Sequence, residues 1–276
     1  MSRIDDTFAA LQARGETALL PYLAVGFPER GATAALAIEL VRGGADGLEL
    51  GIPFSDPLAD GATLQRVCQH ALDAGFRLDD AFDTARRIRA EVDVPIVLMS
   101  YYNPVQRRGL ERFCREAAEA GADGLIVPDL PSEEAGLLRD ACRAVGLTLV
   151  GMLAPTTTDD RMAAACADAE GFIYCVSVVG VTGARTSLAD ELPAFLARVR
   201  QHATVPLVVG FGIARPEHVA AVTQHADGAI VASALVDILE KTPPGQRLET
   251  ARAYIRDLKA ASRRAVSASA KSGEPV

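Results

Sequence analysis

Residues 43–61 read GGADGLELGIPFSDPLADG, and the pattern of their first half recurs as AGADGLIV at 120–127 and HADGAIV at 225–231. In each copy small residues end a helical pattern and an apolar run follows directly. Glycine just past a helix end takes the left-handed conformation without strain. A second junction occurs as VDVPIVLM at 92–99 and ATVPLVVG at 203–210, with proline at the start of an apolar run, where a strand tolerates its missing N–H. The chain therefore repeats a helix-to-strand unit.

Eight short apolar runs alternate with helical patterns along the chain. The runs show little in/out alternation, which is typical of parallel strands covered on both faces. They lie at 19–25, 47–50, 95–101, 124–127, 147–153, 171–177, 205–210 and 228–232. Apolar residues at three- and four-residue spacing predict helices between the runs. The clearest of these helical segments lie at 32–42, 78–91, 107–120, 133–145 and 193–201.

This order of elements predicts the α/β class and a (β/α)8 TIM barrel, with an extra N-terminal helix over residues 2–13 at the barrel bottom. An open doubly wound sheet is the alternative, but it would carry a dinucleotide fingerprint after the first strand, and residues 25–28, VGFP, are not one. We expect a single catalytic domain over residues 1–261. The tail at 262–276 is small and polar, and we expect it to be disordered.

Composition disfavours several classes of protein. Lys and Arg total 28 against 36 Asp and Glu, and the net charge of −8 disfavours a nucleic-acid binder. No apolar run approaches the ~20 residues of a membrane span. Acids near the N-terminus disfavour a signal peptide, so we expect a cytoplasmic protein. The five cysteines form no CxxC pair and the four histidines no HxxH pair, which predicts buried reduced thiols and no metal site.

The segment that follows the second apolar run carries two carboxylates. In a barrel the active site lies at the carboxyl ends of the strands, where this segment is placed. Glu49 stands inside an apolar run, where burial raises the pKa of a carboxyl group and suits it to general acid/base work. Asp60 closes the same loop, so the two acids are predicted to flank one substrate. Two structural alternatives stay open: Glu49 paired with a core arginine, and Asp60 as the cap of a helix that begins near Ala62.

Turns rich in glycine and other small residues follow the last three apolar runs, at 179–183, 209–213 and 231–234. Barrel enzymes bind phosphate with such loops and a helix N-terminus, because backbone N–H groups at glycine approach the anion closely. Neither a Walker motif nor the third glycine of a dinucleotide loop is present. We therefore expect a phosphate group on the substrate. The loop at 178–192 is long enough for a lid.

At these residues the chain resembles the tryptophan synthase alpha subunit family. The matching stretches occur in the same order as in the family over about the first 250 residues, and the first of these stretches is highly specific. Other phosphate-binding barrels share the turn glycines but not that acidic loop. The matching stretches are ELGIPFSDPLADG at 49–61, LMSYYNPV at 98–105, GLIVPDLP at 124–131, GVTGAR at 180–185 and GFGIARPEHV at 210–219.

The resemblance implies a lyase of tryptophan biosynthesis that cleaves indole-3-glycerol phosphate to indole and glyceraldehyde 3-phosphate by a retro-aldol step. It implies that Glu49 is the general acid/base and that Asp60 is the anion that binds the indole N–H. The other implied site residues are Met99, Tyr174 and Phe211 at the indole, Thr182 beside Asp60, and Gly183, Gly212, Ala232 and Ser233 at the phosphate. Ala232 departs from the family, which has glycine there, and it fits without strain only at a negative φ.

The family also implies a partner, a pyridoxal-phosphate-dependent beta subunit that receives indole and assembles with this subunit as an alpha2-beta2 tetramer. The chain has only three lysines and no pyridoxal-phosphate lysine motif, so we expect no cofactor of its own. A proline-flanked stretch at 52–54 is expected to be exposed, together with residues 129–131, and to meet the beta subunit over the substrate mouth.

Two rival functions remain open. One is another barrel enzyme on a related phosphorylated intermediate, such as indole-3-glycerol phosphate synthase or phosphoribosylanthranilate isomerase. The synthase is expected to carry a catalytic lysine early on a strand, and the run at 19–25 has none. The other is a catalytically silent subunit that only activates a beta partner, which the presence of both Glu49 and Asp60 disfavours.

Overall fold

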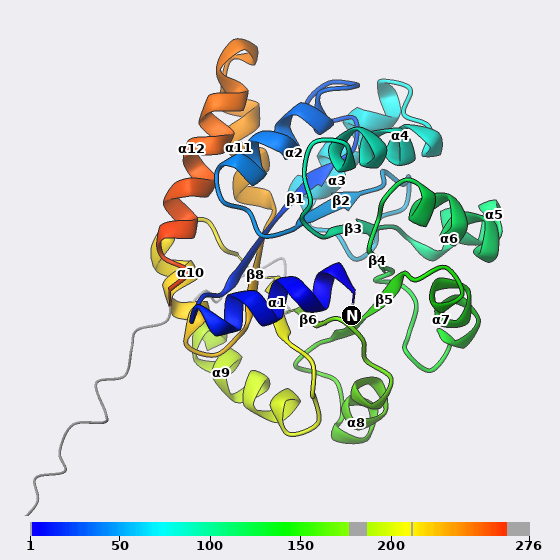
Figure 1. Ribbon diagram of the computed structural model, residues 1–276, viewed down its shortest axis with the longest axis vertical. Helices are drawn as coiled ribbons and strands as arrows, with labels where there is room; N and C mark the ends of the chain where they lie inside the picture. Colours follow the sequence, from blue (N-terminus) through cyan, green and yellow to red (C-terminus); the bar gives the residue numbers. More distant parts are fainter. Residues whose placement is uncertain (1, 177–186, 211, 264–276) are drawn as a thin grey trace, which may run out of the picture.

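The computed structural model describes residues 2–176, 187–210 and 212–263, which form a closed barrel of parallel strands surrounded by helices (Figure 1). Each strand pairs with the next along the chain, and the last pairs with the first. The strands are β1 (Ala18–Ala24), β2 (Leu48–Gly51), β3 (Ile96–Met99), β4 (Gly124–Ile126), β5 (Thr148–Leu153), β6 (Ile173–Val176), β7 (Leu207–Gly210) and β8 (Gly228–Val231). The predicted (β/α)8 barrel is confirmed, and the doubly wound alternative is wrong.

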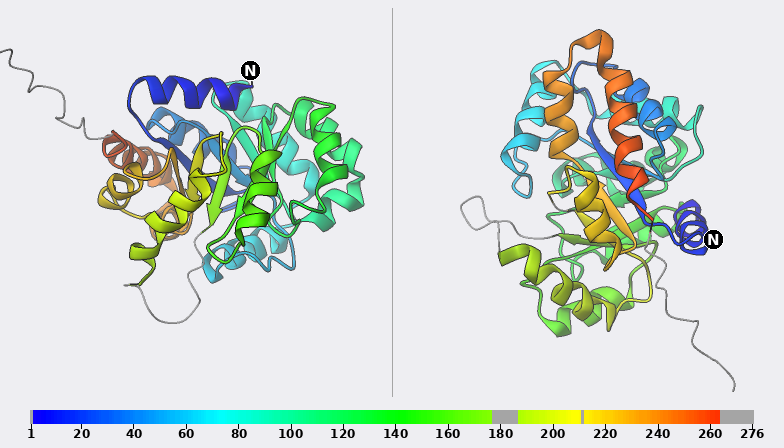
Figure 2. Two further views of the ribbon diagram at one scale, coloured as in Figure 1. Left: turned by 90° about the horizontal axis from the view of Figure 1, so that it is seen from below. Right: turned by 90° about the vertical axis from the view of Figure 1, so that its left-hand side faces the viewer.

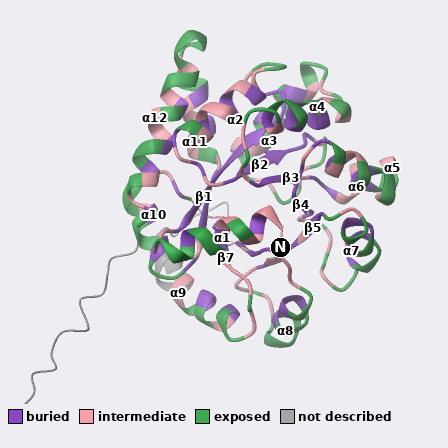
Figure 3. Cartoon of the chain, viewed as in Figure 1, coloured by how far each residue is buried: buried purple, intermediate pink, exposed green. Residues whose placement is uncertain are grey.

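Helices cover the outside of the barrel, so the strands are buried from both sides and belong to one continuous core (Figure 3). This arrangement explains why the strand sequences lack alternation. The helices are α1 (Arg3–Ala13), α2 (Thr33–Arg42), α3 (Ala62–Asp73), α4 (Leu78–Arg89), α5 (Tyr102–Arg108), α6 (Leu110–Glu119), α7 (Gly136–Arg143), α8 (Asp159–Ala167), α9 (Ser187–Arg200), α10 (Pro216–Thr223), α11 (Ser233–Lys241), the 3-10 turn η1 (Pro244–Gln246) and α12 (Arg247–Ala260).

Three predicted helices differ from those observed. The segment at 107–120 belongs to two helices, because Gly109 has φ of 87° and separates α5 from α6. That left-handed conformation suits glycine and interrupts a helix. Helix α7 begins at Gly136 rather than at residue 133, and α9 begins at Ser187 and carries Pro193 in its interior.

The predicted N-terminal helix is confirmed as α1, which lies across the amino end of the barrel (Figure 2). Ser2 begins it with a capping box: its hydroxyl accepts a hydrogen bond from the backbone N–H of Asp5, whose carboxylate accepts one from the backbone N–H of Ser2. Ile4 and Phe8 are buried, and the Phe8 ring lies 5.8 Å from that of Phe172. The helix thus closes one end and leaves the other end for a site.

The three Ala-Asp-Gly junctions hold neighbouring strands together at the same amino end. Each aspartate carboxylate accepts a hydrogen bond from a backbone N–H near the start of the preceding strand. The pairs are Asp46 with Leu19 at 2.9 Å, Asp123 with Ile96 at 2.8 Å and Asp227 with Leu207 at 2.9 Å. Each aspartate also meets a cation: Lys259 at 2.8 Å, Arg89 at 2.7 Å and Arg200 at 2.6 Å respectively. The repeated sequence is therefore a clamp between strands as well as a helix stop.

Residues 262 and 263, just past the expected domain boundary at residue 261, contact the start of the barrel. Ser262 is fully buried, and its carbonyl accepts a hydrogen bond from the Thr17 backbone N–H at 2.8 Å. Arg263 forms a bridge with Glu16. These contacts hold residues 262 and 263 against the barrel, and residues 264–276 lie outside the described part, so the expectation for the tail stays a prediction. Among the described helices, none has the length and apolar character needed to cross a membrane.

Candidate active site

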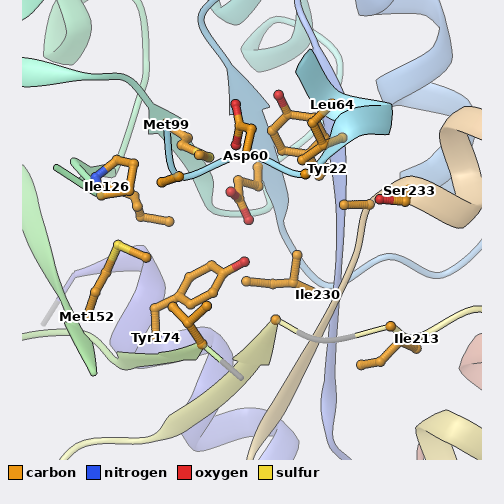
Figure 4. Close-up of a pocket in the computed structure, with 18 of the residues that line it drawn as sticks. Tyr22, Asp60, Leu64, Met99, Ile126, Met152, Tyr174, Ile213, Ile230 and Ser233 are labelled. Carbon is orange, nitrogen blue, oxygen red and sulfur yellow. The ribbon is translucent and has the colours of Figure 1, made fainter. Parts of the chain in front are cut away.

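A cavity of about 650 Å³ opens at the carboxyl end of the barrel (Figure 4). All eight strands contribute to its wall, through Tyr22, Glu49, Met99, Ile126, Met152, Tyr174, Gly210 and Ile230. The predicted site residues Asp60, Gly212, Ala232 and Ser233 also line it. Thr182, Gly183 and Phe211 lie outside the described residues. Most of the wall is apolar, and the carboxyl groups set into it belong to Glu49, Asp60 and Asp237, as expected for a small-molecule site.

Glu49 reaches the cavity from the middle of β2. Its neighbours in the strand, Leu48 and Leu50, are fully buried and point the other way, because successive side chains alternate. Glu49 itself is 2% exposed, and its Oε2 has no hydrogen-bond partner among the described residues. Within those residues it makes no ion pair either, so the alternative of a core arginine finds no support. Burial, with the nearby charge of Asp60, raises the pKa of Glu49 to about 8.

Asp60 lies just before helix α3 and faces the same cavity (Figure 4). The residue that caps α3 is Gly61, which carries no side chain to cap with, so the alternative of Asp60 as helix cap is wrong. Burial raises the pKa of Asp60 to about 6, opposed by a side-chain hydrogen bond from the Tyr101 hydroxyl. At neutral pH Glu49 is therefore mostly a neutral acid and Asp60 mostly an anion.

The loop between β2 and α3, residues 52–61, is fixed at several points and is called the acid loop below. The Ile52 backbone N–H donates to the Met99 carbonyl at 2.8 Å. The Ala59 backbone N–H donates to the Tyr101 hydroxyl at 2.9 Å, and the Phe54 ring stacks on the Tyr101 ring at 5.4 Å. Tyr101 thus holds both sides of the loop and contacts Asp60 directly.

The stretch at 52–54 is not the exposed surface that the sequence predicts. Ile52 and Pro53 are buried, and Phe54 is partly buried against Tyr101, because the loop folds back over the end of β3. The exposed apolar residue of the loop is Leu58, with 90% of its surface accessible. Asp129, on the neighbouring loop, is exposed but accepts a hydrogen bond from the Tyr102 backbone N–H at 2.8 Å, at the start of α5.

The far side of the cavity has the features of an anion site. Ser233 is the first residue of α11, so the positive end of that helix faces the cavity. Ala232 precedes it with a negative φ of −120°, so the departure from glycine does not place alanine in the left-handed region. Gly212 has φ of +42°, in the region that glycine favours.

Tyr22 and Tyr101 are the functional candidates that the sequence analysis missed. Each lies at or just after a strand end, and Tyr22 is the only hydroxyl-bearing residue in the first predicted run. That isolated hydroxyl in an apolar run was the one sign in the sequence that Tyr22 could belong to the site. Placing it beside the two acids required the register of β1 against β2, in which Tyr22 is opposite Glu49. Among the described residues no cluster of three or more His, Cys, Asp or Glu could hold a metal ion.

Comparison with known proteins gives one consistent family. The model of the family described as tryptophan synthase alpha chain matches residues 8–265. The tryptophan synthase alpha chain of Roseiflexus castenholzii is 55% identical over 260 residues, covering 94% of this chain and 100% of the relative. That of Chloroflexus aggregans is 53% identical over 265 residues, covering 96% and 99%.

Comparison with solved structures points to the same family. Tryptophan synthase subunit alpha from Legionella pneumophila superposes with a TM-score of 0.88 at 37% identity, over 95% of this chain and 98% of that one. A Mycobacterium tuberculosis tryptophan synthase chain superposes with a TM-score of 0.88 at 37% identity, over 96% and 99%. With its barrel, its acid loop and these relatives together, the chain belongs to the tryptophan synthase alpha chain family.

Proposed function

We propose that the cavity is where this lyase of tryptophan biosynthesis cleaves indole-3-glycerol phosphate, and that Glu49 and Asp60 are its two working acids. The observation that carries the proposal is the difference between them. Both line one cavity, yet the pKa of Glu49 is raised to about 8 and that of Asp60 only to about 6. Two carboxyl groups with separated pKa values supply one neutral acid and one anion at pH 7.

The retro-aldol step uses these two states in turn. Glu49, neutral and without a partner for its Oε2, donates a proton to indole C3. The ring then carries positive charge at N1–H, which the Asp60 carboxylate stabilises. The Glu49 carboxylate next takes the proton of the hydroxyl on the carbon attached to the ring. The electron pair of the bond between that carbon and C3 returns to the ring, which releases indole and an aldehyde and restores Glu49.

The rest of the cavity supports the same substrate. Met99, Ile126 and Met152 form an apolar wall against which an indole ring packs. Gly212, Ala232 and Ser233 offer backbone N–H groups and a hydroxyl to the phosphate at the other side, and Thr182, Gly183 and Phe211 are assigned to the site by family resemblance alone. Ser233→Asp places a carboxylate where the phosphate binds and should raise KM strongly.

The proposal includes the partner that the family works with, a pyridoxal-phosphate-dependent beta subunit in an alpha2-beta2 assembly. Asp56 and Leu58, both exposed on the acid loop beside the cavity, are the contact we propose. Docking there would bias the loop that carries Asp60.

The proposal also includes a cytoplasmic location, which the five cysteines support, since all are buried as free thiols.

Glu49→Gln tests the proposed chemistry. It keeps the size of the side chain and removes the transferable proton, so lyase activity should fall by at least about 100-fold. Release of indole measures this, with and without beta subunit. A phosphorylated substrate analogue that lacks the scissile bond should still bind. Activity within tenfold of wild type would refute the role of Glu49, and a wild-type chain that releases no indole under either condition would favour the silent activator.

A further inference from the structure

Tyr22 lies deep in the cavity wall and takes no part in the chemistry above. It is near the carboxyl end of β1 and is 2% exposed, with its Cα opposite that of Glu49. Its ring lies over Gly51, because a Cβ at that position would be 2.0 Å from the hydroxyl oxygen and 2.4 Å from Cζ. Gly51 therefore leaves the space that lets the phenol reach across the end of β2.

The hydroxyl reaches helix α3, which packs on β1. There it lies beside the thiol of Cys68, which is 2% exposed, and the two groups interact. The thiol also interacts with the backbone of Phe54 in the acid loop. Burial, with the charges of Cys68, Asp60 and Glu49, raises the pKa of Tyr22 well above its usual value, so the phenol stays neutral. Cys68 thus joins a strand, a helix and the acid loop.

The contacts continue from the acid loop to Asp60. The Phe54 ring stacks on Tyr101, whose hydroxyl accepts the Ala59 N–H and interacts with the Asp60 carboxylate. A continuous series of contacts therefore runs from Tyr22 to Asp60 below and beside the cavity. Packed side chains of this kind hold a reacting group to within a fraction of an ångström only if each contact is made.

We propose that Tyr22 and Cys68 act as one positioning pair for Asp60: the phenol seated over Gly51 and the thiol that it meets hold the acid loop at the depth where Asp60 faces the substrate. The inference rests on the proposed function of Asp60. Neither residue touches the reacting atoms in this role. Without the pair, the Phe54 end of the acid loop is loosened and water reaches Asp60.

The test compares Tyr22→Phe, Cys68→Ala and the double variant with wild type, by the pH profile of indole release. Each single variant should lower kcat about tenfold, because small misplacements of a positioned group are costly. The acid limb of the profile is the fall in activity at low pH, where Asp60 becomes protonated. This limb should move to lower pH, since burial is the main cause of the raised pKa of Asp60. Because the two residues act as one unit, the double variant should be no worse than either single one. Cys68→Ser keeps a small polar group beside the phenol and should restore most of kcat.

Tyr254→Phe is the matched control. It also removes a tyrosine hydroxyl, here a partly buried one that donates to the Ala214 carbonyl at 3.0 Å, away from the acid loop. It should leave the acid limb in place whatever it does to Tm. A wild-type pH profile in Tyr22→Phe, or additive losses in the double variant, would overturn the inference while leaving the proposed function intact. Absence of lyase activity in the wild-type enzyme would instead overturn the proposed function. If one single variant does not fold, the pH profiles of the other single variant and of Cys68→Ser still test the proposal.

Discussion

At the scale of single residues, burial rather than ion pairing gives the site its chemistry. Glu49 and Asp60 are carboxyl groups of similar intrinsic acidity. They differ because Glu49 is enclosed by the barrel strands, whereas Asp60 sits at the mouth with a hydrogen bond from Tyr101. Desolvation penalises the charged form more where enclosure is more complete. One side chain is consequently poised as a proton donor and the other as an anion at the same pH.

These pKa values predict a bell-shaped dependence of kcat/KM on pH. In the proposed mechanism, activity needs Asp60 ionised, above about pH 6, and Glu49 protonated, below about pH 8. The Tyr101 hydroxyl favours the ionised form of Asp60, so Tyr101→Phe should move the acid limb to higher pH and leave the basic limb near its place. Rates of indole release between pH 5 and 9 measure both limbs. An acid limb that stays in place or moves to lower pH would show that Tyr101 does not stabilise the Asp60 anion.

At the scale of elements, the same aspartate motif serves a structural purpose at the opposite end of the barrel. Asp123 is 8% exposed, accepts the Ile96 N–H, and pairs with Arg3 and Arg89. Its contacts tie β3, β4, α1 and α4 together. The clamp explains how a four-residue strand such as β3 keeps its register: the junction residues, not the strand length, set the pairing.

Asp123→Asn should lower the free energy of unfolding by about 2–4 kcal/mol, because it removes the buried anion that two partly buried arginines share and leaves only the exposed Asp93 to pair with them. Asp93→Asn is the matched control: Asp93 pairs with the same two arginines but its side chain is 88% exposed, so the cost should stay below about 1 kcal/mol. Urea unfolding measures both. The kcat/KM of Asp123→Asn should stay near wild type, since the site lies at the other end. Equal losses of stability in the two variants would contradict the clamp.

At the scale of the whole molecule, the barrel separates stability from function. Helix α1 and the aspartate junctions close the amino end, while the cavity, the acid loop and the N-terminus of α11 occupy the carboxyl end. A partner that docks over the carboxyl end contacts the loop that carries Asp60 without disturbing the core. This division allows a barrel to be regulated through its loops.

Leu58→Asp and Asp56→Lys test the docking surface. Both side chains are exposed, so each variant should fold normally and keep most of its basal indole release, while stimulation by beta subunit should fall at least about tenfold. Leu248→Asp, on the flank of α12, is the control and should leave stimulation unchanged. Asp129 is unsuitable because it holds the start of α5. If basal and stimulated rates fall in the same proportion, the beta subunit does not dock at this loop.

The sequence by itself determined the eight strands, their order, the closing helix α1 and the acids Glu49 and Asp60, because apolar runs, helix stops and a carboxylate in an apolar run are local signals. Only the tertiary structure decided how Tyr22, Cys68 and Tyr101 relate to Asp60, why 52–54 is buried, and how far apart the two pKa values lie. These depend on strand register and on which distant segments exclude water from each group. Neither property is contained in any short stretch of chain, since both arise when the barrel closes.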